Sequence, residues 1–290
     1  MPDRARLSAG PLTEPLAAMA KAGAGTGIEL AWLGQAGFLL RARTLALAID
    51  PYLSNSLTRK YAGTATPHER IMPAPVPPEA LCGLDFVFST HRHTDHMDPE
   101  TLVPLLAAND RAVLIAPQAA AGRIGEIGIA ENRIRLVNAG DAFELADGIR
   151  LQVLASAHEG LDRNDDGDYP FLGYGLTLDG LTIYHSGDCV PYDGLGDAVA
   201  ALDADLALLP INGRRPELAA RGIPGNFTPR EAAALCVSAG IPNLIAHHFG
   251  MFAFNSADPD AALAEIRKQA PALNALAASL ATLYRLAPEH

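Results

Sequence analysis

The densest group of reactive side chains is a short stretch with three histidines and an aspartate, namely His91, His93, Asp95 and His96. It directly follows the apolar run Leu84–Thr90, which predicts a buried strand, so we expect the four side chains on a loop at that strand's carboxyl end. Residues two apart in extended backbone point the same way, so His91 and His93 can hold one ion. Asp95 and His96 can turn towards a second ion. Imidazole and carboxylate ligands suit zinc, manganese or iron.

Further candidate ligands stand where other predicted strands end: His158, Asp188, His247 and His248. Each alone is typical of a hydrogen-bonded residue at a strand end. Together with the histidine cluster, they supply the additional ligands that a two-ion site needs. Neighbours at a strand end point to opposite faces, so His247 and His248 cannot both reach the same ion.

Composition narrows the class of protein. Of the 290 residues, 49% are hydrophobic and 19% are charged, which excludes a disordered chain. The net charge of −11 argues against nucleic-acid binding, because a phosphate backbone is bound mainly through Lys and Arg. The three cysteines are widely spaced, and no apolar run reaches the length of a membrane span. We therefore expect a cytoplasmic protein that acts on a small molecule, with no nucleic-acid or membrane partner. The composition leaves open whether the protein forms a homo-oligomer.

The elements that must position these side chains alternate along the chain. Residues 28–49 read as a β-meander, and a long connection, 52–80, follows it. Asp179-Gly180 marks a hairpin, and the last third alternates strand and helix. For the tail, residues 273–286, both a helix and a final strand fit the pattern.

Strands and helices in both halves, with no linker between two cores, predict one α/β domain. Its expected bounds are residues 28–290. Residues 1–27 are rich in Ala and Gly and are expected to form a loosely held arm or short helix outside the core.

The ordered set His91-x-His93-x-Asp95-His96, then His158, Asp188 and a late histidine, resembles the metallo-β-lactamase superfamily. That resemblance implies a four-layer αββα sandwich with a dinuclear metal site between its two sheets, at the strand ends. Several shorter motifs are similar to the L-ascorbate-6-phosphate lactonase-like branch, namely Asp168–Gly173, Tyr184–Asp188, Leu209–Gly213 and Gly225–Thr228.

The resemblance also implies a role for each ligand. One divalent ion, zinc or manganese, would be held by His91, His93 and His158. The other would be held by Asp95, His96 and His248, with Asp188 as the bridge. His248 is preferred to His247 because Phe249 follows it, as in the branch. Asp50 matches an early aspartate of the superfamily and would orient a ligand histidine, although an aspartate before a proline is also typical of a turn.

The implied activity is metal-dependent hydrolysis by a hydroxide that bridges the two ions, with Asp95 and Asp188 as catalytic residues. The preferred substrate is a small anionic sugar-derived lactone or carboxylic ester. The alternatives are a phosphodiesterase for lipid-derived or cyclic phosphates and a diiron protein that reduces oxygen or NO. The diiron protein is disfavoured by His93, since glutamate is typical there. A non-catalytic remnant is disfavoured because every ligand position is filled.

Substrate contacts are predicted at the ends of two late strands, at Asn212, Arg214, Arg215 and Asn226, with Arg221 in the same basic cluster. A solvated basic turn explains the arginines equally well. Asp162–Gly167 resembles the start of a calcium loop, but its twelfth position is Gly173 and no amphipathic helices flank it. Cys189 is expected to be a small buried residue that points away from Asp188.

Overall fold

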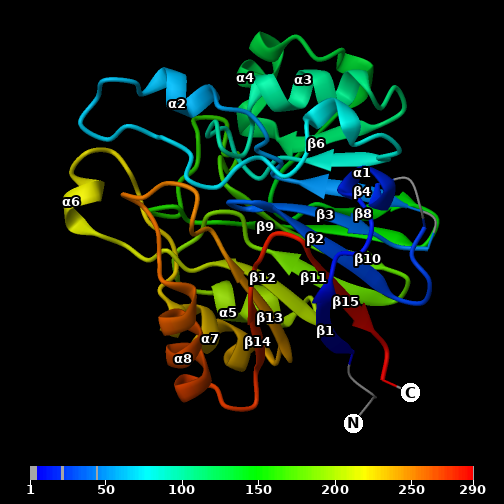
Figure 1. Ribbon diagram of the computed structural model, residues 1–290, viewed down its shortest axis with the longest axis vertical. Helices are drawn as coiled ribbons and strands as arrows, with labels where there is room; N and C mark the ends of the chain where they lie inside the picture. Colours follow the sequence, from blue (N-terminus) through cyan, green and yellow to red (C-terminus); the bar gives the residue numbers. More distant parts are fainter. Residues whose placement is uncertain (1–4, 21–22, 44, 290) are drawn as a thin grey trace.

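The structure is a computed structural model that describes residues 5–20, 23–43 and 45–289. It contains two β-sheets that pack face to face, with helices on their outer sides (Figure 1). Helices α3 and α4 cover one sheet, and α5, α7 and α8 cover the other (Figure 1). The expected αββα sandwich is confirmed. No helix in the described ranges is long and apolar enough to cross a membrane.

The first sheet has eight strands in the spatial order β1-β15-β2-β3-β4-β5-β6-β7. Their bounds are β1 (Arg6–Pro11), β2 (Ile28–Gly34), β3 (Gly37–Arg41), β4 (Ala46–Ile49), β5 (Phe86–Phe88), β6 (Val113–Pro117), β7 (Ile134–Val137) and β15 (Thr282–Ala287). Strands β2, β3 and β4 pair antiparallel in sequence order, which confirms the predicted meander. Strands β4 to β7 then run parallel.

The second sheet has seven strands in the order β14-β13-β12-β11-β10-β9-β8. Their bounds are β8 (Ala142–Ala146), β9 (Ile149–Ala155), β10 (Leu172–Leu178), β11 (Leu181–His185), β12 (Leu206–Pro210), β13 (Asn243–His247) and β14 (Asn274–Ala277). The predicted hairpin joins β10 to β11 through Asp179 and Gly180, with φ values of 50° and 81°. Positive φ at both central residues is typical of the type I′ turn that matches the twist of the strands.

The helices are α1 (Leu16–Met19), α2 (Ser56–Lys60), α3 (Pro99–Ala107), α4 (Ala121–Ile127), α5 (Leu195–Ala200), α6 (Pro216–Ala219), α7 (Pro229–Ala239) and α8 (Pro259–Gln269). Three short 3₁₀ turns are η1 (Pro78–Ala80), η2 (Gln118–Ala120) and η3 (Glu131–Arg133). Helix α3 begins just after the histidine cluster, where Asp98 caps its first turn and Pro99 occupies the first helical position. The start of this helix therefore ends the ligand loop.

The N-terminal segment contains the expected short helix, α1, but its described residues are not a loosely held arm outside the core. Strand β1 pairs antiparallel with β15 along its whole length, and Leu7 is buried in the core between the sheets. Met19 of α1 is buried as well. Burial of the apolar side chains of these small elements stabilises the folded protein, so the segment packs against the core. Residues 1–4 and 21–22 of the expected arm lie outside the described ranges.

The tail that sequence alone left open consists of strands. Strand β14 extends the second sheet beside β13, and β15 lies between β1 and β2 in the first sheet. The tail therefore connects the two sheets. In both places the neighbouring strands offer backbone N–H and C=O groups for pairing, so the tail forms strands there.

Candidate metal centre

All predicted ligands lie on loops that follow strands at one edge of the sandwich. The histidine cluster follows β5, and the others follow β9, β11 and β13, at His158, Asp188 and His248. Strands β11, β12 and β13 are parallel, and β9 runs in the same direction because β10 is antiparallel to both neighbours. Their carboxyl ends therefore meet at one edge. Ligand atoms lie within 4.8 Å of one another in three groups: His91, His93 and His158; His91, His96 and Asp188; and Asp95, His96 and His248.

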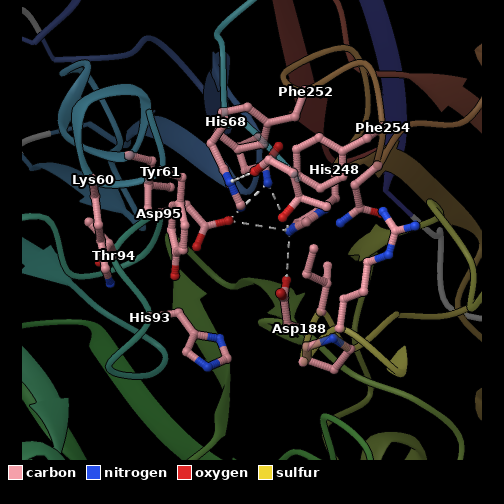
Figure 2. A pocket seen from close by; sticks show the side chains of 18 of the residues that line it. Lys60, Tyr61, His68, His93, Thr94, Asp95, Asp188, His248, Phe252 and Phe254 are labelled. Atoms are coloured by element: carbon pink, nitrogen blue, oxygen red, sulfur yellow. Dashed lines mark hydrogen bonds and ion pairs between the residues drawn. The ribbon is translucent and has the colours of Figure 1, made fainter. Parts of the chain in front are cut away.

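Asp188 lies at the centre of these groups. Its Oδ1 is 3.0 Å from Nε2 of His248 and 3.4 Å from Nε2 of His96. Its Oδ2 is 3.5 Å from Nε2 of His158. Figure 2 shows Asp188 and His248 facing each other across the centre. One carboxylate thus contacts imidazoles from both predicted ligand sets.

His91, His93 and His158 form the other side of the centre. Nε2 of His91 lies 3.0 Å from Nδ1 of His93. The ring of Phe171 packs against all three imidazoles, with centroid separations of 5.0, 5.7 and 5.2 Å. Phe171 stands in one of the lactonase-like motifs, and its contact with the ligands is a feature that the sequence did not reveal.

Asp50 orients His96. Its carboxylate accepts hydrogen bonds from the backbone N and the hydroxyl of Thr90, at 2.7 and 2.6 Å. Oδ2 also lies 2.7 Å from Nδ1 of His96, and both side chains are fully buried. Because a carboxylate accepts, Nδ1 of His96 carries the proton and donates it, while Nε2 is directed towards Asp188.

Gln35 is a positioning residue that sequence reasoning missed. Its Nε2 donates to Oδ2 of Asp95 at 2.9 Å and lies 3.3 Å from Nε2 of His248. Its backbone oxygen accepts from the backbone N of His248 at 3.0 Å, which links the two sheets. Gln35, Asp50 and His248 all have positive φ, at 51°, 45° and 68°. Such strained backbone at non-glycine residues clusters at functional sites, but it is visible only in the structure, and the sequence carried no signal for Gln35.

The protonation of the centre follows from its buried carboxylates. Burial by itself lowers the pKa of His96, but the negative charges of Asp188, Asp50 and Asp95 raise it well above its usual value. Burial lowers the pKa of His158 to about 4. Burial raises the pKa of Asp188, yet the charges of His248 and His96 bring it well below the usual value. The negative charges of Asp50, Asp95 and Asp188 therefore favour a positive charge between these side chains.

The donor set fits divalent metal ions. In the part of the chain that the structure describes, Nε2 of His96 and Nδ1 of His158 are buried without a hydrogen-bond partner. A buried polar atom without a partner costs about 1–3 kcal/mol, which a coordinated ion can offset. Imidazole and carboxylate donors suit zinc, manganese or iron. These His and Asp groups could therefore hold such ions.

His247 lies away from the centre. Its ring stacks on His185 at a centroid separation of 5.3 Å and meets the edge of Phe38 at 5.3 Å. It is fully buried in the layer between the sheets. Of the two adjacent histidines, only His248 reaches Asp95 and Asp188.

A cavity of about 340 Å³ opens onto the centre, and Asp95, Asp188, His93, His158 and His248 form its floor. Its remaining walls come from the segments around α2, around residues 221–224 and around residues 252–255. The sequence assigned the first of these segments to a plain connection. A cavity of this size suits a small-molecule ligand.

The four predicted substrate contacts do not line this cavity. Arg214 pairs with Glu231 of α7, and Arg215 donates to the backbone oxygen of Ser256. Asn226 donates to Asn212, which in turn donates to the cavity residue Asn255. Only Arg214 contacts α7, whereas the other three side chains contact the segment 255–256 or one another, so none of the four is directed into the cavity. Of the basic cluster, only Arg221 lines the cavity.

The rival motifs take structural roles. Cys189 is buried in the core, where burial raises the pKa of its thiol to about 11, as expected for an inert small residue. In the acidic loop, Oδ1 of Asn164 accepts from the backbone N of Asp166 and of Asp168. That oxygen closes a turn.

Comparisons with known proteins agree with this geometry. Solved structures that share the fold include a metallo-beta-lactamase fold protein of Bacillus subtilis, with a TM-score of 0.64 and 16% identity over 89% of this chain and 99% of that one. A possible metal-dependent hydrolase of Veillonella parvula has a TM-score of 0.69 at 16% identity, over 89% and 99% of the two chains. The fold and the edge site thus define a protein with the metallo-β-lactamase fold.

A family model described as a beta-lactamase superfamily domain matches residues 47–249, and the chain belongs to this superfamily. A relative in Myxococcus xanthus, named UPF0173 metal-dependent hydrolase, is 29% identical over 249 residues, which are 83% of this chain and 77% of that protein.

Proposed function

We propose that this protein is a metal-dependent hydrolase that cleaves carboxylic-ester bonds in the manner of a lactonase, with a small anionic sugar-derived substrate. The observation that carries the proposal is the position of Asp188, whose two oxygens contact imidazoles of both ligand sets. Membership of the superfamily and the names of the relatives support the hydrolase class. The lactonase-like motifs of the sequence support the choice of bond.

Two divalent ions, zinc or manganese, fit the donor atoms. His91, His93 and His158 would hold one ion. Asp95, His96 and His248 would hold the other, and Asp188 would bridge them. When bound, such a pair of ions lowers the pKa of a water molecule and neutralises negative charge that develops during hydrolysis.

Protein side chains then position and move protons. Oδ2 of Asp95 is fixed by Gln35, and Asp95 lies at the floor of the cavity. Burial raises the pKa of Asp95, but the charges of His96, His248 and His93 together outweigh burial and lower the pKa, so the carboxylate is ionised and can accept a proton from the attacking water. It can pass that proton to the leaving oxygen.

No protein nucleophile is required for this chemistry. Among the described residues that line the cavity there is neither a serine nor a cysteine. The two buried cysteines, Cys189 and Cys236, have raised pKa values because of burial, which disfavours the reactive thiolate. Attack by water therefore fits the cavity better than attack by a side chain.

The test is a hydrolysis panel with protein reconstituted with zinc or with manganese. The panel contains phosphorylated sugar lactones, simple esters, phosphodiesters and β-lactams, and elemental analysis measures the metal content of each preparation. We expect about two ions per chain, as in related two-metal sites, and the highest kcat/KM for lactones or esters. Preference for phosphodiesters would favour the phosphodiesterase alternative. A folded protein that takes up no metal would contradict the whole proposal.

A further inference from the structure

The cavity has one wall made of aromatic rings, which we call the aromatic wall: Tyr61, His68, Phe252 and Phe254. His68 stacks on Tyr61 at 4.2 Å between ring centroids and meets the edges of Phe252 and Phe254 at 5.1 and 4.7 Å. Figure 2 shows His68, Phe252 and Phe254 together on one side of the cavity, with His93 and Asp188 on the other. None of these four rings belongs to the ligand set.

The aromatic wall is a fixed structure. Its two segments are joined by a β-bridge between Arg70 and Phe252 and by a hydrogen bond from Ile71 N to Met251 O of 3.0 Å. The guanidinium of Arg70 donates to the backbone oxygens of Tyr52 and Ser54 at 3.0 and 2.8 Å. Phe252 also belongs to a small hydrophobic cluster with Tyr52, Leu57 and Met251, against which Tyr61 and Phe254 pack. A wall that is ordered beforehand loses little entropy when a ligand binds.

His68 contributes to this wall as a neutral ring. Its Nδ1 lies 2.8 Å from the backbone oxygen of Thr66, and because a carbonyl only accepts, Nδ1 carries the proton. Burial lowers the pKa of His68, so the ring stays uncharged at neutral pH. Tyr61, His68 and Phe254 of the aromatic wall are partly exposed, so the wall can contact a flat apolar group.

The opening of the cavity carries positive charge. Lys60, Arg92 and Arg221, which we call the cationic rim, line the cavity and are exposed. In the described part of the chain, none of them forms an ion pair, whereas Arg214 and Arg230 pair with glutamates. The only carboxylates among the described lining residues are Asp95 and Asp188, which belong to the metal centre. Nζ of Lys60 lies 5.1 Å from the ring centroid of Tyr61, and the three cations of the rim can receive an anionic group at this cavity.

We propose that the substrate is an anion with a flat apolar face, which packs on the aromatic wall while the cationic rim binds the negative group. This inference rests on the proposed hydrolase function and specifies what the same site selects. Two sources offer that chemistry: an aryl carboxylate, and a phosphorylated sugar lactone whose ring presents its C–H face. The cavity of about 340 Å³ limits either to a small molecule.

The test compares three acetates of primary alcohols, so that the reacting bond stays the same. They are 4-(acetoxymethyl)benzoate, benzyl acetate without the charge, and 4-(acetoxymethyl)cyclohexanecarboxylate without the flat ring. We expect kcat/KM for the benzoate to exceed each of the others by about tenfold, as an ionic hydrogen bond or an aromatic contact provides. A phosphorylated sugar lactone is measured beside them to separate the two sources.

Variants assign the preference to the two surfaces. Arg221→Gln should lower the ratio of benzoate to benzyl acetate about tenfold. Phe254→Leu keeps an apolar side chain and should lower the ratio of benzoate to cyclohexanecarboxylate several-fold. Arg150→Gln, at an exposed arginine of β9 outside the cavity, is the matched control and should change neither ratio. If the sugar lactone is preferred to the benzoate, its kcat/KM must also fall in Phe254→Leu, and independence from Phe254 would overturn the inference.

The two proposals fail in different ways. Hydrolysis of all three acetates at similar rates would overturn the inference and leave the hydrolase function standing. If no ester is hydrolysed, the proposed function is wrong. The inference is then tested by calorimetry, which measures binding of the alcohol 4-(hydroxymethyl)benzoate. Binding that weakens in Arg221→Gln and in Phe254→Leu supports it, and absence of binding to the wild-type protein overturns it.

Discussion

Asp50 and His96 are joined inside the protein, with Oδ2 of the aspartate 2.7 Å from Nδ1 of the histidine and both side chains fully buried. Two hydrogen bonds from Thr90 hold the carboxylate in place. The pair sets the direction in which Nε2 of His96 points, towards Asp188. Such a partner behind a ligand histidine controls both its tautomer and its basicity.

Replacement of Asp50 by asparagine should therefore weaken metal binding. Asparagine tolerates the positive φ of this position but lacks the negative charge and one acceptor function. We expect metal affinity or activity to fall by about 10–100-fold, with the fold retained by circular dichroism. Asp85→Asn is the control, because Asp85 also accepts a backbone hydrogen bond, from Ala46, but it directly precedes β5, at the end of that strand opposite to the histidine cluster. Equal losses in both variants would show that Asp50 acts only through stability.

His248→Ala should remove one of the two metal ions and lower kcat by orders of magnitude, because His248 reaches both Asp95 and Asp188. Elemental analysis of the variant and steady-state kinetics measure both effects.

His247→Ala is the matched comparison at the adjacent position. It should keep both ions and lower the free energy of unfolding by about 3 kcal/mol, because a buried ring that packs on Phe38 and His185 is lost. Denaturant unfolding checks this. If His247→Ala loses metal and His248→Ala does not, the assignment of His248 is wrong.

Asp188→Ala should abolish turnover while the fold remains. The carboxylate contacts imidazoles of both ligand sets, so its loss would remove the charge that the two proposed ions share. The preceding strand β11 is buried and paired on both sides, so we expect the backbone to persist. Near-wild-type activity with normal metal content would exclude Asp188 as the bridge.

The acid–base properties of His96 predict how metal binding depends on pH. In the metal-free protein its raised pKa means that Nε2 holds a proton, which a metal ion must displace. Binding should therefore release protons, and affinity should increase as pH rises towards the pKa of His96. Calorimetry in buffers with different ionisation enthalpies measures the number of protons released. A heat of binding that is the same in all buffers would contradict the prediction.

The same pKa values fix the sign of the stability change in the chelated protein. His96 has a raised pKa in the folded state, so its contribution is complete below the unfolded pKa near 6.5 and is lost as pH rises through the folded pKa. Asp188 has a lowered pKa, so its contribution is present above the unfolded value and is lost as pH falls through the folded one. In thermal unfolding experiments, the melting temperature of the chelated protein should fall at both low and high pH. The metal-loaded protein should lose less stability than the chelated one at high pH.

The sequence by itself determined the donor types, their order and their placement at strand ends. This was possible because buried strands and polar turns leave local patterns, as in the apolar run before His91 and the turn at Asp179-Gly180. The same patterns predicted one α/β domain, and the αββα sandwich was implied by the family resemblance. Local signals of this kind need no knowledge of what packs across the sheets.

Only the tertiary structure decided which distant groups meet. Gln35 reaches Asp95 and His248 from a turn far away in sequence, and β1 pairs with β15 at the opposite end of the chain. Likewise, the predicted substrate residue Arg214 pairs with Glu231 of α7, while the predicted connection 52–80 contributes two of the four rings of the aromatic wall. These contacts come from the packing of two sheets and their loops, which depends on the whole chain and leaves no periodic pattern in any one segment.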